Sequence, residues 1–262
     1  MNPRLNDLNF NTFLVEANLQ PYVQSYWQVQ KKLTSMSNFN IAPDGAMGII
    51  INLGDQITIK TQKKNYILKN KGIILLGVFT YCVNMALTNN CHLVGIRFNP
   101  AGASAFFRDS SARLYQNNIL LDEVELYEKL SLQSVDIADV FNEYLHNKMN
   151  IDNHILNLLS LLKYIDNKKG LVDIYHLASV LSMSRRNFDR TFKKYVGLSP
   201  KIYIRIIKIK YTRNQLRTFM FTNLTEVGYD NGYFDQAHFI REFKTFMSQV
   251  PKDYVKEKKA LS

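Results

Sequence analysis

One short pattern occurs twice in the last third of this chain, about fifty residues apart, at residues 177–194 and 227–244. Each copy has a short apolar segment of helical character, a turn, and a second helical segment that carries Phe-x-x-x-Phe. A single segment of this kind is usually only part of a core. Two copies with similar turns predict a tandem pair of helix-turn-helix units within residues 171–254, with the rest of the chain controlling them.

The positive charge of the chain is concentrated in the same region. Residues 1–151 hold 13 Lys and Arg against 12 Asp and Glu, whereas residues 152–262 hold 20 against 10. Most of the formal net charge of +11 therefore lies in the last two-fifths of the chain. This asymmetry favours a C-terminal half that binds a polyanion. A generally basic, solvated surface is the alternative that charge alone leaves open.

The second helix of each unit is expected to have an inward and an outward face. Phe188 and Phe192 in the first copy, and Phe239 and Phe243 in the second, should pack on the preceding helix. On the outward face, Arg can bind guanine and Gln can bind adenine, while Lys is suited to phosphate. The expected base contacts are Arg185, Arg186, Asp189, Arg190, Gln236, His238 and Arg241, and the expected phosphate contacts are Ser184, Lys193, Lys194, Arg205 and Lys244.

Residues 151–262 show the start and stop signals of an all-α domain. Asp173 stands where a helix N-cap is expected, and two further helices are expected to begin at Asp152 and at Ser184. Gly170 and Gly197 are suited to end helices.

A longer helix is expected between the two copies, starting at Ser199-Pro200 because Pro is favourable at the first helical position. As a rigid spacer it would hold two recognition helices in successive major-groove segments, about 34 Å apart. Its apolar positions are expected on one face: Ile202, Ile206, Ile209 and Leu216.

The first hundred residues contain short, alternating apolar segments typical of strands. They lie at residues 21–29, 39–41, 47–53, 56–61, 66–68, 73–79, 83–87 and 92–98. Their number and spacing predict a β-sandwich or a β-barrel, which commonly encloses a cavity for one small ligand. A core filled by Ile49, Ile51, Leu75, Val94 and Ile96 would leave no cavity. Inward polar side chains, such as Asn52, Tyr81 or Arg97, would favour a ligand.

Beyond Asn99-Pro100 the pattern becomes helical, at residues 101–108, 120–130 and 135–149. These helices either link the strands to the basic half or form a dimer face. With the boundary near Asn150, we predict an α+β chain of two domains, residues 1–150 and 151–262.

The two cysteines, Cys82 and Cys91, are too few for a secreted disulfide scaffold. Residues 1–10 are polar and the apolar runs are too short to span a bilayer. We therefore expect a cytoplasmic protein with no membrane partner. The thiols are expected to be ordinary buried side chains of a sheet rather than a thiol switch.

Residues 182–201 and 235–244 resemble the two recognition segments of AraC/XylS-type bacterial transcription regulators. They read SMSRRNFDRTFKKYVGLSPK and DQAHFIREFK. The chain departs from the usual family pattern at Gly228, where Ala is common, and at Lys208, where Arg is common. It also departs at the exit of the second unit, residues 248–251, which lacks the usual Gly.

Residues 22–27, 43–45 and 95–102 resemble, more weakly, the β-rich sensor domains of some family members. The resemblance implies a cupin-like barrel and regulation of transcription initiation, often by activation through RNA polymerase. It implies double-stranded DNA as a partner and leaves a small-molecule effector and a homodimer open.

The sequence disfavours two other functions. A cupin-type metalloenzyme needs clustered His and carboxylate ligands, but only His92 of the five histidines lies among the strands. We therefore predict no enzyme, catalytic residue, metal or cofactor. RNA binding is disfavoured because no aromatic stacking platform is evident. The remaining alternative is an effector-independent regulator whose N-terminal half serves dimerisation or protein contact.

Overall fold

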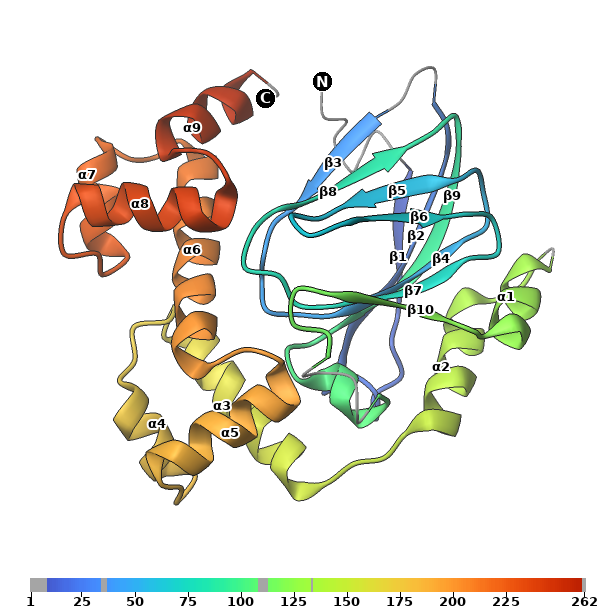
Figure 1. Cartoon of the computed structure of the whole chain (residues 1–262), viewed down its shortest axis with the longest axis horizontal. Coiled ribbons are helices and arrows are strands. Elements are labelled where there is room, and N and C mark those ends of the chain that lie inside the picture. The colour runs from blue at the N-terminus through green and yellow to red at the C-terminus, as the bar shows by residue number, and fades with distance from the viewer. Residues whose placement is uncertain (1–8, 34–36, 108–112, 133, 261–262) are drawn as a thin grey trace.

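The computed structural model describes residues 9–33, 37–107, 113–132 and 134–260. A β-rich N-terminal domain lies beside an all-helical C-terminal domain, and the chain passes between them through helices (Figure 1). Arg108 and residues 1–8, on which two of the sequence predictions partly rest, lie outside the described residues. No helix in the described ranges is both long and apolar enough to cross a membrane.

Ten strands of the described chain form two antiparallel sheets. The larger sheet has the order β1 (Phe10–Phe13), β2 (Val23–Lys32), β9 (Asn90–Phe98), β4 (Gly48–Asn52), β7 (Ile73–Leu76) and β10 (Asn118–Leu121). The smaller sheet has the order β3 (Ser37–Ile41), β8 (Val83–Leu87), β5 (Ile57–Lys60) and β6 (Asn65–Leu68). Each predicted strand segment is present. The two sheets stay separate, so the β-rich domain is confirmed but a closed barrel is not formed.

The larger sheet is buried on both faces, which corrects the predicted core. Ile50 and Ile74 belong to the cluster that includes Ile57 and Ile59 of the smaller sheet. The five residues expected to fill the domain interior are all buried, but they belong to the cluster shared with the helices and the C-terminal domain. Because neighbouring side chains of a strand point to opposite faces, Ile49 and Ile51 cannot share a face with Ile50. These five residues therefore do not fill the space between the sheets.

Two details of the region after the predicted strands, and one strand before them, differ from the sequence predictions. Leu120 and Leu121, expected in a helix, belong to β10 and pair with Ile74 and Ile73. The following helices are α1 (Val124–Ser131) and α2 (Ile137–Lys148). The helix expected after Pro100 is only a short 3-10 turn, Gly102–Ala105. Strand β1 was not predicted, because its four residues show no strong apolar alternation.

The C-terminal domain consists of α3 (Asn153–Asn167), α4 (Ile174–Val180), α5 (Arg185–Val196), α6 (Pro200–Thr218), α7 (Leu224–Asp230), α8 (Gln236–Met247) and α9 (Pro251–Lys259). The predicted N-cap is confirmed, because Asp173 accepts from the Tyr175 amide at 3.1 Å. Asp152, where a helix was expected to begin, also acts as an N-cap and accepts from the Ile155 amide at 3.0 Å. Gly197 ends α5 with a φ of 79°. The predicted boundary near Asn150 falls between α2 and α3.

Helix α6 is buried on more than the one predicted face. Ile204 and Ile207 are buried as well, whereas Ile202 is only half-buried. The reason is that α6 packs against α3, α5, α7, α8 and α9 and also meets the N-terminal domain. A Cβ atom built on Gly45 would lie 2.6 Å from the ring of Tyr203, so a turn of the N-terminal domain sits directly on α6.

The N-terminal domain contacts both ends of the helical domain. Ser104 Oγ donates to the Tyr195 carbonyl at 2.7 Å at the end of α5. The Cys82 thiol faces the carbonyls of Phe246 and Met247, at 3.7 and 3.6 Å, at the end of α8. Burial raises the pKa of Cys82 and of Cys91 to about 11, so both thiols stay protonated at neutral pH.

Candidate nucleic-acid interface

The two helix-turn-helix units, α4–α5 and α7–α8, have the same helix lengths. The first helix has 7 residues and the second has 12 in both units. The turns begin alike, since the Met183 amide donates to Ala178 and the Tyr233 amide donates to Gly228, each at 3.0 Å. The residue before each of these donors is left-handed, with a φ of 52° at Ser182 and 72° at Gly232.

The inward faces of both second helices are built as the sequence predicts. Phe188, Phe192, Phe239 and Phe243 are fully buried. The rings of each pair meet edge to face, with centroids 5.6 Å apart in α5 and 5.9 Å apart in α8. Such pairs add stability beyond that of the buried area alone and fix how each helix is rotated about its axis.

Gly228 lies where α7 crosses α8. A Cβ atom there would lie 3.4 Å from the nearest side-chain atoms of Phe239, which is ordinary contact distance. Ala178 occupies the equivalent position in the first unit. The crossing therefore needs a small residue but does not require glycine.

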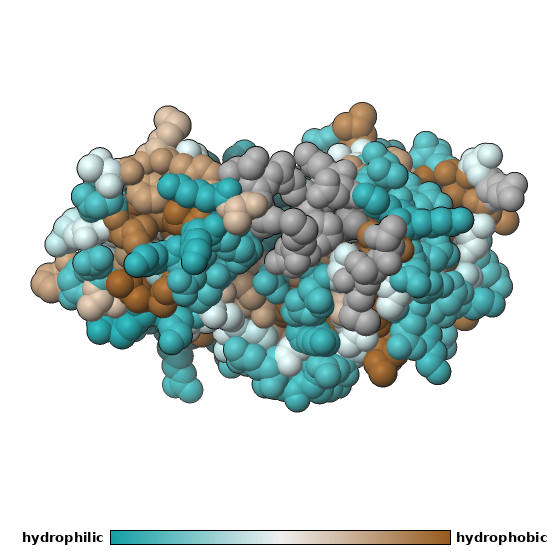
Figure 2. All heavy atoms as spheres, turned by 90° about the horizontal axis from the view of Figure 1, so that it is seen from above, coloured by the Kyte–Doolittle hydropathy of each residue, from teal (hydrophilic) through white to brown (hydrophobic). Residues whose placement is uncertain are grey.

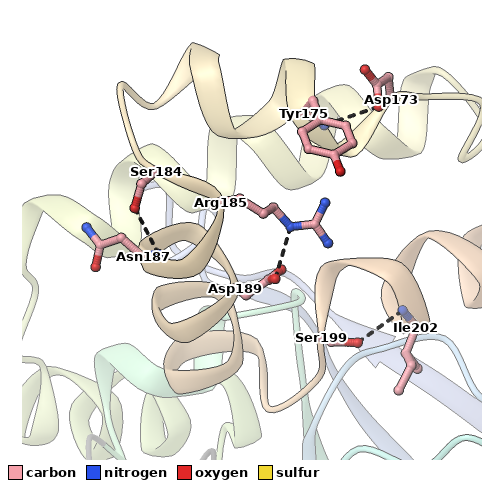
Figure 3. A network of polar contacts seen from close by, with 8 residues as sticks. All are labelled: Asp173, Tyr175, Ser184, Arg185, Asn187, Asp189, Ser199 and Ile202. Atoms are coloured by element: carbon pink, nitrogen blue, oxygen red, sulfur yellow. Dashed lines mark hydrogen bonds and ion pairs between the residues drawn. The ribbon is translucent and has the colours of Figure 1, made fainter.

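The outward face of α5 presents a partly organised set of charged side chains. Arg186 and Arg190 are exposed, and Arg190 donates to Asn187 Oδ1 at 2.9 Å. Arg185 is half-buried, because its Nε donates to Asp189 Oδ2 at 3.0 Å and its guanidinium lies over the ring of Tyr175 (Figure 3). The structure thus brings together the four predicted base-contact residues of α5.

The predicted phosphate contacts of the first unit lie around this set. Lys193 and Lys194 are exposed at the last turns of α5. Lys194 Nζ donates to the hydroxyl of Tyr195 at 3.2 Å. Ser184 is exposed and its hydroxyl caps α5 by accepting from the Asn187 amide at 3.3 Å (Figure 3).

Most of the predicted contact residues on the outward face of α8 are exposed. Gln236, Arg241 and Lys244 are exposed. His238 is half-buried, and its ring meets that of Tyr233 edge-on at 5.6 Å. Asp235 caps the helix by accepting from the His238 amide at 2.6 Å.

Arg205 joins α6 to α8 through Glu242. Its Nε and Nη2 donate to the two carboxylate oxygens at 2.8 and 2.5 Å, and its guanidinium lies 5.1 Å from the ring centre of Phe246. The hydrogen bonds to Glu242 raise the pKa of Arg205. Arg205 therefore has a structural partner as well as its predicted phosphate role. The pairing spans 37 residues, so no local pattern could have revealed it.

The unusual exit of the second unit keeps the expected geometry. Ser248 takes the left-handed position after α8 with a φ of 59°, and its amide donates to the Lys244 carbonyl at 2.9 Å. Helix α9 then begins at Pro251, and its Tyr254 packs on Phe243 at 5.5 Å. The missing glycine therefore changes neither the turn nor the packing that follows.

The polar side chains considered as ligand contacts in the N-terminal domain have partners within the protein. Asn52 donates to the carbonyls of Asp55 and Leu68 at 2.8 and 2.9 Å. Arg97 forms an ion pair with Asp44. The hydroxyl of Tyr81 accepts from a loop amide at 3.3 Å. These contacts explain their burial without a ligand.

Two hollows lie near this region. A cavity of about 30 Å³ is lined by residues that include Leu76, Phe79 and Arg97. A cleft of about 620 Å³ lies between the two domains, with Asp44 on one side and Lys210 on the other. Within the described ranges, no three His, Cys, Asp or Glu side chains are placed to hold a metal ion.

Two family models match separate parts of the chain. Residues 177–257 match a helix-turn-helix domain family, and residues 11–120 match a domain of unknown function (DUF6597). The chain is 29% identical over 96 residues to XylDLEGF operon transcriptional activator 3 of Pseudomonas putida, covering 36% of this chain and 29% of that protein.

A second relative is an uncharacterized HTH-type transcriptional regulator of Haemophilus influenzae, 30% identical over 83 residues, which are 32% of this chain and 28% of that protein. The chain thus spans less than a third of the length of these curated relatives.

Among solved structures, ToxT from Vibrio cholerae has a similar fold. It is 12% identical, with a TM-score of 0.50 over 88% of this chain and 98% of that chain. The relatives are transcription regulators, and the fold is shared across both domains. Residues 177–257 are therefore a helix-turn-helix domain similar to those of these transcription regulators, and they follow a β-rich N-terminal domain.

Proposed function

We propose that this protein regulates transcription by binding specific sequences of duplex DNA through α5 and α8. One observation carries the proposal: two matched units hold their second helices on the single buried helix α6, with phenylalanines inward and Arg, Lys and Gln side chains outward. A recognition helix in the major groove needs this two-sided arrangement.

The exposed side chains divide into two proposed roles. Arg186 and Arg190 of α5, with Gln236 and Arg241 of α8, are the main base contacts, because they combine exposure with groups that match base edges. The half-buried Arg185, Asp189 and His238 are proposed base contacts of smaller effect. Ser184, Lys193, Lys194, Arg205 and Lys244 would contact phosphates, which position a protein on DNA.

The named activity of the Pseudomonas putida relatives supports activation of transcription as the outcome. We therefore propose RNA polymerase as a protein partner. We also propose that the protein forms a homodimer, which sedimentation can test. A regulator of this kind in a bacterium acts in the cytoplasm. The proposed domains are residues 1–150 and 151–262, with the second sufficient for DNA contact.

The test is a selection of bound sequences from a random duplex pool by the purified full-length protein, followed by affinity measurements on the recovered site at stated salt. A site bound more tightly than its scrambled version supports the proposal. Lys60→Ala, an exposed basic residue of the N-terminal domain, is the charge-matched control for α5 and α8 variants and should bind normally. Equal binding of site and scrambled DNA would contradict the proposal.

A second candidate function is control by a small molecule in the interdomain cleft. Its volume lies within the range of small-molecule sites, about 300–1,000 Å³, and both domains line it. An occupant would therefore affect how the domains pack.

The test measures DNA affinity with and without a small-molecule cell extract, for the wild type and for Ser160→Trp, which fills the cleft. A response present only in the wild type supports effector control. Full affinity without extract, and no response to it, would leave an effector-independent regulator.

A further inference from the structure

The two helix-turn-helix units differ by one residue in their turns. In the first unit, the residues between α4 and α5 are 181–184, and in the second unit the residues between α7 and α8 are 231–235. Both turns begin with equivalent hydrogen bonds and have a left-handed residue at the same position, Ser182 or Gly232. The extra residue therefore lies at the end of the longer turn. That residue is Phe234, directly before the N-cap Asp235.

The position of Phe234 is one where an apolar side chain normally stabilises a helix. A hydrophobic residue before the N-cap often packs on the fourth residue of the helix. In the first unit that place is held by Met183, which is half-buried against the core. In the second unit Tyr233 makes the equivalent contact, with its ring 5.3 Å from that of Phe239.

Phe234 is consequently left out of the core. Its side chain is 87% exposed, whereas its neighbour Tyr233 is buried and Asp235 is held by the cap. Apolar side chains gather among hydrophilic ones over this end of the C-terminal domain (Figure 2). The ring of Phe234 is therefore open to solvent beside the first turn of α8.

We propose that Phe234 is a sequence-reading residue that contacts the methyl group of a thymine in the major groove. This inference rests on the proposed DNA binding by α8. The N-terminal residues of a recognition helix are the ones that reach base edges, and Phe234 lies two residues before Gln236, the first residue of α8. Among the groups that base pairs present in the major groove, the thymine methyl is the apolar one.

The experiment uses the full-length protein and the site recovered from the random pool, with each thymine replaced singly by deoxyuridine, which lacks the methyl group. The wild type should lose about fourfold in affinity at one thymine of the half-element read by α8, the effect of one buried methyl-sized group. Phe234→Ala should lose a similar factor on the unmodified site and become indifferent to that replacement. Phe234→Leu should retain part of the sensitivity.

Met220→Ala is the matched control, since Met220 is 83% exposed in the loop before α7 and should not affect either DNA. Unchanged affinity of Phe234→Ala, or an equal loss on the thymine and deoxyuridine sites, would overturn the inference. Normal DNA binding combined with lost transcription activation would instead assign the ring to a protein partner and likewise overturn it. Loss of site discrimination in Arg241→Ala would still support DNA reading by α8, so the two proposals can fail separately. If no site is recovered, both fail.

Discussion

The two helix-turn-helix units share one architecture but are held by different contacts. The first unit packs against the N-terminal domain where Ser104 donates to Tyr195, and its outward face carries the internal pair Arg185–Asp189. The second unit is fixed to α6 by Arg205 and Glu242. Both second helices thus end against the N-terminal domain, α5 through the hydrogen bond from Ser104 and α8 through the longer contact of the Cys82 thiol, and α8 has in addition an ion pair to α6. Matched sequence repeats need not be matched in how they are stabilised.

The largest expected effect is the loss of an inward phenylalanine. Phe188→Ala and Phe239→Ala should each destabilise their unit by about 3–5 kcal/mol, because each removes a fully buried ring from the core. Hydrogen exchange resolved by segment checks whether the loss is local. Phe239→Ala should expose amides of α7 and α8 and loosen the contact with Cys82, whereas Phe188→Ala should expose amides of α4 and α5 and loosen the contact with Ser104. Exposure of the same segments in both variants would remove the distinction between the units.

A smaller effect is expected on specificity. Arg190→Ala and Arg241→Ala should each weaken binding to the selected site by about 1–3 kcal/mol while leaving the fold intact, the range for a base contact with two hydrogen bonds. Competition between the selected site and random DNA measures this directly. Circular dichroism melting of both variants controls for a loss of stability. If both variants still discriminate between the selected site and random DNA as the wild type does, the assignment of base contacts is wrong.

The next smaller effect is expected from breaking the ion pair between α6 and α8. Arg205→Ala should destabilise the second unit by about 1–2 kcal/mol, since it leaves the mostly buried Glu242 without its partner. Urea unfolding measures the change. Lys129→Ala removes the more exposed pair with Glu143 and should cost less than about 0.5 kcal/mol. Equal costs for the two variants would mean that the ion pair does not hold α8.

The smallest effect should be stabilising. Gly228→Ala should raise the stability of the second unit by about 0.5–1 kcal/mol, because alanine favours the helix and its methyl group finds ordinary contact distance from Phe239. A thermal melt of the variant beside the wild type measures it. A loss of stability would show that the crossing of α7 and α8 is tighter than that of α4 and α5.

Features that depend on neighbouring residues were predictable from the sequence. The N-cap Asp173 and the helix starts at Asp152 and Ser184 were predicted correctly, because the hydrogen bonds that cap these helices span only two or three residues. The inward phenylalanines followed from helical spacing in the same way.

Features that depend on packing between distant segments were not predictable. Ile49 and Ile50 were both recognisable as strand residues, but which face meets the smaller sheet is decided by helices much later in the chain. The prediction of a closed barrel was wrong for a similar reason, because whether two sheets join at their edges also depends on pairing between distant strands. The partner of Arg205 and the outward position of Phe234 also depend on tertiary contacts. The sequence could therefore predict which residues belong to the candidate site, but not which of them are paired with other side chains.

The most direct measurement of the central claim is the sequence selection repeated with Arg190→Ala and Arg241→Ala in the full-length protein. Two recognition helices held on α6 should select a wild-type motif with two half-elements about one helical turn apart. Arg190→Ala should relax one half-element and Arg241→Ala the other. Relaxation of the same positions by both variants, or binding without any motif that simply falls as salt rises, would contradict two separate recognition helices.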